Sequence, residues 1–202
     1  MSAGSNQTKE ESEYARLKKK IIDAASLLFE EKGLYQTSVG EIAELAGVSV
    51  PDAYKYVRRK SEIMLLIMED FTSQFQERIL PAIERLDDPK KKLIRAMDLF
   101  YSIAAEKASQ VLLLYRESRS LDKQGQARIM DAELAHVKIF QDILEEGIGR
   151  GVFKHHDAHQ IAYNIVILGH AWALKRWHLK KRFDLKEYLD LQYKFIIETI
   201  TS

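Results

Sequence analysis

Apolar residues recur at helical spacing along most of the chain, and no segment shows the alternation that indicates a β-strand. Residues 1–11 are polar, and we expect them to be frayed. The first predicted helix covers about 13–32 and ends at Gly33. A later helix opens at Ser61, and Pro81 in its continuation predicts a kink or a break. With the two short helices described next, the pattern predicts an all-α protein of about nine helices, the others lying at about 89–107, 109–118, 124–147, 158–180 and 185–200.

Residues 45–57 contain a tight turn between two short helices. Ser38 and Glu41 have the spacing of a capping box at the start of the first helix. Gly47 closes that helix where a left-handed backbone is needed, and Ser49 can cap the second helix. Two short helices joined in this way form a helix-turn-helix, whose second helix can enter the DNA major groove. The turn alone leaves a generic helical hairpin open.

The flanks of this turn carry further short motifs in a fixed order over about fifty residues. They are an Ile-x-Ala-Ala-x-x-Leu-Phe helix, Gly33, Thr37-Ser38, Ile42-Ala43, Ala46-Gly47-Val48-Ser49, Tyr54-x-Tyr56 and Lys60. This block resembles the N-terminal domain of the TetR family of bacterial transcriptional regulators. The chain departs from the family pattern at 50–52, where a Lys-Gly-Thr-like stretch is common, and at Val57, where Phe is common. The first departure changes the surface that reads bases, so it bears on the operator sequence rather than on the fold.

The resemblance implies a DNA-binding domain at 1–60 and an effector-binding and dimerisation domain at 61–202. It places Val50, Pro51 and Asp52 against the floor of the DNA major groove. There Val50 and Pro51 could contact a thymine methyl, and Asp52 could accept from a cytosine amino group. Capping of its own helix is the alternative for Asp52, and packing inside the head is the alternative for Tyr54. The contacts expected with phosphate or sugar are those of Thr37, Ser38, Ser49, Tyr54, Lys55, Tyr56 and Lys60.

Composition narrows the class of protein further. Of 202 residues, 46% are hydrophobic, and only 3 are Pro and 9 Gly, which leaves room for a large core and long helices. Cysteine is absent, so there is neither a disulfide framework nor a thiolate metal site. No apolar run approaches the ~20 residues of a membrane span. We expect a cytoplasmic protein with no cofactor and no metal, and we interpret the histidines at 155–159 as a solvated loop.

The formal net charge of +1 means that DNA affinity has to come from local clusters of basic residues. One cluster lies at 16–20 and the other at 55–60, so the two bracket the helix-turn-helix.

In the C-terminal body, core packing and effector binding compete for the same residues. Arg176 continues a four-residue stripe on the helix at 158–180, where it either pairs with a carboxylate such as Glu117 or awaits an anionic effector. The candidate effector-binding residues are Tyr101, Tyr115, Arg116, Arg119, His136, Phe140, Asn164, Leu168, Trp172 and Arg176.

Residues 172–178 and 115–118 resemble TetR relatives whose effectors are acyl-CoA thioesters. An apolar tunnel with basic residues at its mouth would suit such an ester. A drug-like aromatic cation fits less well, because inward-facing acids are scarce in the sequence.

The last two predicted helices carry broad apolar faces that a second copy could bury in a four-helix bundle, which would match a palindromic operator. These faces hold Ile161, Ile165, Leu168 and Trp172 on one helix, and Leu189, Tyr193, Ile196, Ile197 and Ile200 on the other. The sequence thus predicts a homodimeric, non-catalytic repressor released from its operator by a small molecule. The alternatives are a helical carrier or enzyme with a vestigial head, and a regulator that activates or needs a co-repressor.

Overall fold

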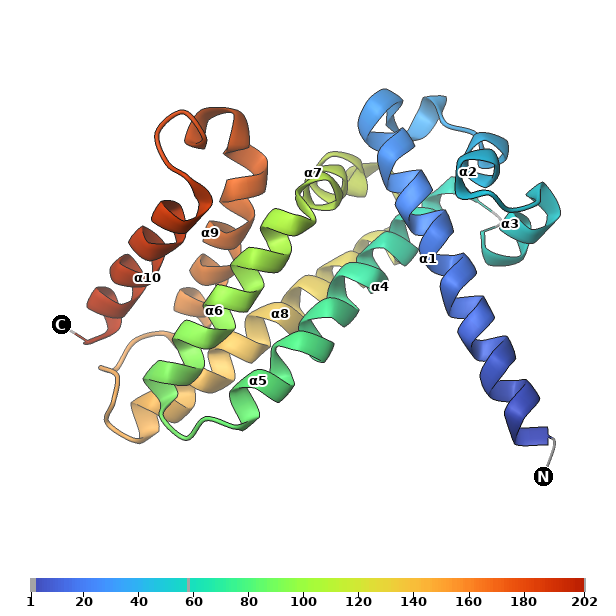
Figure 1. The fold of residues 1–202 in the computed structure, drawn as a ribbon. Helices are drawn as coiled ribbons and strands as arrows, with labels where there is room; N and C mark the ends of the chain where they lie inside the picture. Colours follow the sequence, from blue (N-terminus) through green and yellow to red (C-terminus); the bar gives the residue numbers. More distant parts are fainter. Residues whose placement is uncertain (1–2, 58, 202) are drawn as a thin grey trace.

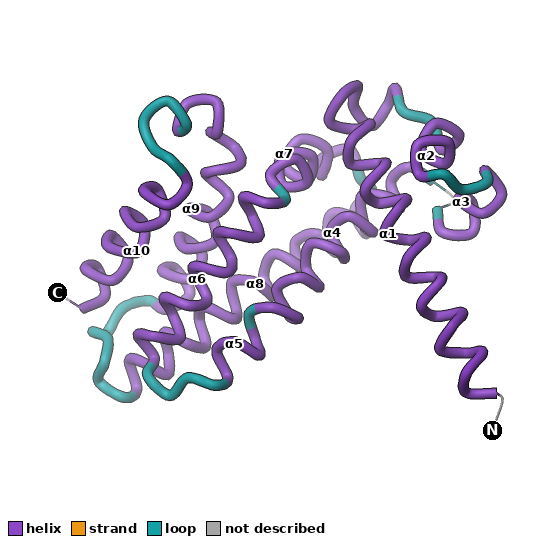
Figure 2. Tube along the Cα trace, in the orientation of Figure 1, coloured by secondary structure: helices purple, strands orange, loops and turns teal. Residues whose placement is uncertain are grey.

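The computed structural model describes residues 3–57 and 59–201, with side chains described from residue 13 onward except at 60, 61 and 120. Every regular element in these ranges is a helix (Figures 1 and 2). The α-helices are α1 (Ala3–Gln36), α2 (Val39–Ala46), α3 (Val50–Tyr56), α4 (Lys60–Arg78), α5 (Leu80–Glu84), α6 (Pro89–Glu106), α7 (Ala108–Glu117), α8 (Lys123–Gly149), α9 (Ala158–Leu179) and α10 (Leu185–Thr201). A single 3-10 turn, η1 (Ser118–Ser120), follows α7.

The fold class is therefore confirmed, and Pro81 acts as predicted. The helix expected from Ser61 onward breaks at Ile79, where α4 has ended and α5 begins. Pro81 lies in the first turn of α5, where a missing N–H is tolerated. The nine expected helices become ten labelled α-helices, because the break divides one of them.

Residues 3–11, which were expected to be frayed, form the first turns of a helix, and residues 1 and 2 lie outside the described residues. Helix α1 begins at Ala3, and its first turns extend beyond the rest of the head (Figure 1). Residues 7–20 are rich in Glu, Lys, Gln and Arg, which have high helix propensity. The expected stop at Gly33 is a kink instead: Gly33 has φ 83° and ψ 164°, and one more helical turn follows it to Gln36.

The head consists of α1, α2 and α3 around a small core. Ile22, Ala25 and Phe29 of α1 pack with Ile42 and Ala53, and all five are buried. Helix α4 leaves this head at Lys60 and packs against both α1 and the body helices α6, α7 and α8. The proposed boundary between 1–60 and 61–202 falls at the start of this shared helix and stays a prediction.

The body is built on α6, α8 and α9, with α4, α7 and α10 around them (Figure 1). Its core holds Phe75, Phe100 and Phe140, whose rings lie edge to face or tilted against one another. Helices α6 and α9 approach closely at Gly169, where an added Cβ would lie 2.6 Å from the rings of Phe100 and Tyr101. This core fixes the positions of the side chains that face α4.

Candidate DNA-binding head and effector cavity

Helix α2 is held at its N-terminus by Ser38 and Glu41. The Ser38 hydroxyl accepts from the Glu41 N–H at 3.2 Å, and the Glu41 carboxylate accepts from the Ser38 N–H at 2.8 Å. The ammonium of Lys32 also donates to Glu41. The hydrogen bond from Lys32, followed by those from Ser38, lowers the pKa of Glu41 to about 2. The predicted capping box is confirmed, and it fixes α2 in its position before the turn.

The turn itself has the predicted backbone. Gly47 lies in the left-handed region with φ 64°, and its N–H donates to the carbonyl oxygens of Ala43 and Glu44. Ser49 then caps α3, because its hydroxyl accepts from the Asp52 N–H at 3.1 Å. Local hydrogen bonding within a few residues accounts for both features, which is why the sequence could predict them.

Asp52 is engaged within its own helix. Its carboxylate accepts from the Ser49 hydroxyl at 2.5 Å and from the Lys55 ammonium at 2.6 Å. The Lys55 hydrogen bond is the main cause of its lowered pKa. The side chain nevertheless remains 42% exposed, so base contact stays a prediction beside this local role.

Exposed side chains gather at the start and outer face of α3. Val50 and Pro51 are exposed, and Tyr54 is 50% exposed, which disfavours its alternative role in packing the head. Tyr56 is half-buried, and its ring lies 4.7 Å from that of Tyr14 on α1. Tyr56 therefore also braces α3 against α1.

For two of the predicted phosphate contacts, Thr37 and Lys60, the structure gives a different outcome. Thr37 is buried, and its hydroxyl donates to the carbonyl oxygen of Gly33 at 2.8 Å, so it secures the kink that follows α1. A phosphate contact through this hydroxyl is therefore disfavoured, because the hydroxyl is buried and already has an internal acceptor, while a contact through the N–H groups at the start of α2 stays a prediction. The side chain of Lys60 lies outside the described residues.

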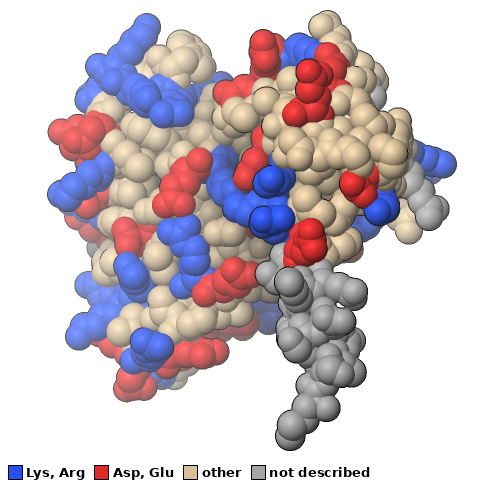
Figure 3. All heavy atoms as spheres, turned by 45° about the vertical axis from the view of Figure 1, so that its right-hand side comes forward, with Lys and Arg blue, Asp and Glu red and all other residues tan. Residues whose placement is uncertain are grey.

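Positive and negative side chains are interspersed over the face shown in Figure 3, in line with the net charge of +1.

A cavity of about 130 Å³ lies in the body, between α4, α7, α8 and α9. Its walls are formed mainly by apolar side chains, and polar side chains enter from α7, η1, α8 and α9. The lining residues are Met68, Phe71, Val111, Leu114, Tyr115, Ser118, Ile129, Glu133, His136 and His170.

The two histidines of this cavity are buried. The Nδ1 atom of His170 lies 3.0 Å from the hydroxyl oxygen of Tyr115, but its Nε2 has no hydrogen-bond partner among the described residues. Neither ring nitrogen of His136 has one in the same part of the chain. Burial, with a contribution from His170, lowers the pKa of His136 to about 3, and burial lowers that of His170 to about 4. Both imidazoles are therefore neutral near pH 7.

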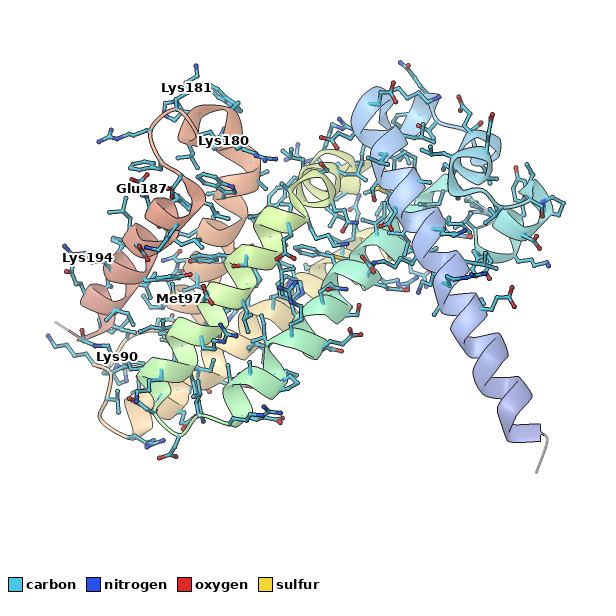
Figure 4. The ribbon with its side chains drawn as sticks, viewed as in Figure 1. Lys90, Met97, Lys180, Lys181, Glu187 and Lys194 are labelled. Atoms are coloured by element: carbon cyan, nitrogen blue, oxygen red, sulfur yellow. The ribbon has the colours of Figure 1, made fainter. Side chains whose placement is uncertain are left out.

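A second, more open cleft of about 800 Å³ lies where α9 turns into α10. Figure 4 shows Lys180 and Lys181 at this corner, and Trp172, Arg176 and Arg182 also line the cleft. Glu106, Asp184 and Glu187 line this cleft beside its basic side chains, whereas the cavity beside α4 is smaller and has mainly apolar walls.

Comparison with known proteins decides the family. The sequence model for bacterial regulatory proteins of the tetR family matches residues 21–67, and that for the tetracyclin repressor-like C-terminal domain matches residues 86–181. The chain belongs to the TetR family. It is accordingly a DNA-binding transcriptional regulator, and the resemblance found in its helix-turn-helix is confirmed.

Individual TetR relatives extend over most of the chain. The transcriptional regulator HbdR of Aromatoleum sp. (strain CIB) is 29% identical over 178 residues, which cover 88% of this chain and 78% of that protein. FadR from Bacillus subtilis, solved with stearoyl-CoA, has a TM-score of 0.74 at 25% identity and covers 91% of this chain and 97% of its own. AibR, solved with isovaleryl coenzyme A and operator DNA, has a TM-score of 0.73 at 18% identity, with 89% and 97% covered, and shares the fold.

The residues that the sequence proposed for effector binding separate into several groups in the TetR body. Tyr115 and His136 line the cavity, whereas Trp172 and Arg176 line the open cleft between α9 and α10. Tyr101 and Phe140 are core residues that line neither space, because their helix faces meet other helices there.

The remaining candidates lie outside the cavity. Asn164 is exposed and accepts from Gln160, and Leu168 is half-buried with its carbonyl bound by Tyr188. Arg119 is exposed after the end of α7, while Arg116 donates to Glu117 and to the carbonyl oxygen of Phe29.

The proposed Arg176–Glu117 bridge is wrong. Glu117 pairs with Arg116 at 2.7 Å, and no described carboxylate forms an ion pair with Arg176. Among the described residues, moreover, no three His, Asp or Glu side chains are grouped as metal ligands, and no helix is long and apolar enough to cross a membrane.

Sequence reasoning missed His170, Glu133 and Phe71. A histidine inside the apolar run Ile165–Ala173 was a usable signal, because a buried polar side chain in such a run needs an explanation. Glu133 lies one helical turn before His136, so the two share a face of α8. It is the one acidic side chain among the residues described as lining the cavity, so acids there are scarce but not absent.

The apolar residues that α9 and α10 expose differ from those expected in the dimer interface. Trp172, Ile165, Leu189, Ile196 and Ile200 are buried within the chain itself. A different apolar stripe stays exposed on the same two helices, formed by Tyr163, Ile167, Leu191 and Phe195. TetR regulators are dimeric, and these two helices remain the expected interface, but through this exposed stripe.

Proposed function

We propose that the chain is a repressor that leaves a palindromic operator when the acyl group of a CoA thioester fills the cavity beside α4. One observation carries this proposal: Met68 and Phe71, two residues of α4, form part of the cavity wall. Helix α4 starts at Lys60, four residues after the last residue of α3. A ligand that enlarges the cavity therefore acts on the helix that positions the recognition helix.

The switch requires that the effector prefer the arrangement that does not bind DNA. Two recognition helices of a dimer have to enter successive major grooves about 34–36 Å apart. A displaced α4 would alter this spacing in both subunits. A complete switch needs a preference of roughly 10⁴-fold for the non-binding arrangement, whereas a smaller preference gives partial release.

An acyl-CoA suits the chemistry of this region. The cavity walls are apolar, and Tyr115 and Ser118 are partly exposed at its α7 side, close in sequence to the exposed cation of Arg119. An acyl group could be buried while the phosphates of CoA stay near basic side chains. That FadR and AibR were solved with CoA thioesters supports this class of effector.

A cationic effector is the second candidate, because Glu133 lines the cavity. Burial raises the pKa of this carboxyl. We favour the acyl group, because the walls of the cavity are mainly apolar and two solved TetR structures hold CoA thioesters.

We also propose that the chain performs no catalysis and works in the cytoplasm, where its operator lies. His136 has no described hydrogen-bond partner that could orient it as a general base. A catalytic role would predict turnover of a small molecule. A carrier role would predict binding of a small molecule with no change in the affinity for operator DNA.

The test uses fluorescence anisotropy of the full chain on the DNA upstream of its own gene, with CoA thioesters of increasing acyl length. Free CoA and a lipophilic aromatic cation are the controls. Release by a thioester, but not by CoA, would support the proposal. Release by the cation alone, or the absence of operator binding at low salt, would contradict it. A gain of affinity with thioester would indicate a co-repressor.

A further inference from the structure

The effector cavity has a second hollow behind one part of its wall. A groove of about 200 Å³ is lined by residues of α4 and α8, among them the half-buried side chains of Leu65, Thr72 and Ala132. Of the residues described as lining the cavity and the groove, only Met68 lines both. A side chain shared in this way forms the wall between the two spaces.

From this we infer that Met68 sets the length of the acyl group that the effector can carry, because its side chain closes the cavity toward the groove. The inference rests on the proposed function, since it specifies the acyl group of the proposed effector. It adds a limit on chain length, which apolar walls by themselves do not set.

The cavity and the groove follow the same pair of packed helices. On α8, Ile129 lines the cavity and Ala132 lines the groove. On α4, Phe71 lines the cavity and Thr72 lines the groove. Met68 lies about one helical turn before these two residues and is 7% exposed. The contact between α4 and α8 therefore separates the two spaces, and Met68 lies in this contact.

Other apolar residues of the cavity wall differ from Met68 in what lies behind them. Phe71, Val111 and Leu114 are buried in the core, and none of them lines the groove. Truncating one of them would enlarge the cavity locally, whereas truncating Met68 would join the cavity to the groove. A methionine also suits a wall of irregular shape, because its unbranched side chain adapts to the space around it.

The volume of the cavity limits the chain as long as Met68 stays in place. An apolar cavity of ~150 Å³ accommodates one benzene ring, so a cavity of about 130 Å³ has room for about five carbon atoms. Each further methylene group improves binding only where it leaves water for apolar surroundings. A longer chain has to displace Met68 or stay in water, and the gain in affinity per methylene should then stop.

The groove is also connected to the DNA-binding head. Glu69 of α4 and Arg128 of α8 both line it, and they form an ion pair at 2.5 Å. Glu69 pairs in addition with Lys18 of α1 at 3.2 Å. A chain that passed Met68 would therefore lie beside side chains that join α4, α8 and the head. Chain length should accordingly affect operator release as well as affinity.

The experiment measures how affinity depends on acyl length in the intact protein. Dissociation constants for butyryl-, hexanoyl-, octanoyl- and decanoyl-CoA come from isothermal titration calorimetry, and operator release from anisotropy. In the wild type, we expect the gain in affinity to level off near hexanoyl-CoA. In Met68→Ala it should continue, by about fourfold for each methylene that is buried. The preference for octanoyl-CoA over butyryl-CoA should thus rise at least about tenfold above the wild-type value.

Two variants make the assignment specific. Met68→Leu conserves the volume of the side chain and should keep the wild-type dependence on length. Met97→Ala is the matched control, because it makes the same truncation at a buried site of α6 that lines neither space (Figure 4). Thermal melting of each variant checks its folding. Met68→Val, which removes less of the side chain, repeats the test should Met68→Ala unfold.

An unchanged preference in a folded Met68→Ala or Met68→Val protein would overturn the inference. A steady gain of about fourfold per methylene up to decanoyl-CoA in the wild type would do the same, since Met68 would then set no limit. In both cases, operator release by a thioester would leave the proposed function intact. Binding of none of the four thioesters would overturn both.

Discussion

The guanidinium of Arg116 donates to the main-chain carbonyl oxygen of Phe29 at 2.8 Å, and so joins the end of α7 to α1 of the head. The same helix α7 contributes Val111, Leu114 and Tyr115 to the cavity wall. A shift of α7 on effector binding would therefore reach the head through this hydrogen bond as well as through α4.

Arg116→Ala should weaken the response to effector while leaving operator affinity without effector nearly unchanged. Residues on such a connection change coupling by about 0.5–2 kcal/mol, or roughly 2- to 30-fold in the effector concentration needed for release. Anisotropy titrations of the operator complex measure this. Arg95→Ala, an exposed cation on α6, is the control. An unchanged response of the Arg116 variant would show that this hydrogen bond does not carry the signal.

Tyr54→Ala should weaken binding to operator and to unrelated DNA by similar factors, because Tyr54 is assigned to the backbone rather than to bases. The head should stay folded, since half of this side chain is exposed. Binding isotherms on both DNAs test the prediction. The control is Tyr35→Ala, a 75% exposed residue outside α2 and α3. A loss confined to the operator would reassign Tyr54 to base recognition.

Folding stability should fall as the pH drops below about 6.5, the ordinary pKa of histidine. The pKa values of His136 and His170 are lowered to about 3 and about 4 in the folded protein. Their contribution is therefore fully present above the unfolded pKa and is lost as the pH falls toward the folded value.

At pH 5 each buried histidine should cost about 2 kcal/mol relative to pH 7.5. His136→Phe should remove about half of this loss in melting experiments at the two pH values. His178→Phe, on the exposed end of α9, is the control. An equal pH dependence in wild type and His136→Phe would show that this ring protonates freely in the folded chain.

Phe195→Asp should produce folded monomers that bind operator at least about 10²-fold more weakly, because it places a charge in the exposed stripe of α9 and α10. Ile196→Asp should instead unfold the chain, since Ile196 is buried in its own core. Sedimentation velocity and thermal melting separate the two effects. A dimeric Phe195→Asp protein would locate the interface elsewhere.

Much of the head was predictable because its signals are local. The capping box of Ser38 and Glu41, the left-handed Gly47 and the cap at Ser49 each depend on groups within a few residues of one another. Pro81 likewise breaks its helix through its own backbone chemistry. The burial of Thr37 was not predictable, because its acceptor becomes available only when Gly33 kinks α1.

In the body, the sequence determined that the chain is helical and which positions repeat at helical spacing. Periodicity shows that a side chain faces inward, but it does not show which other helix that side chain meets. The tertiary structure alone decided that His136 of α8 meets His170 of α9 and Phe71 of α4 around one cavity. It also decided that Glu117 pairs with Arg116 rather than Arg176, because helix packing, not sequence spacing, sets which charges come within reach.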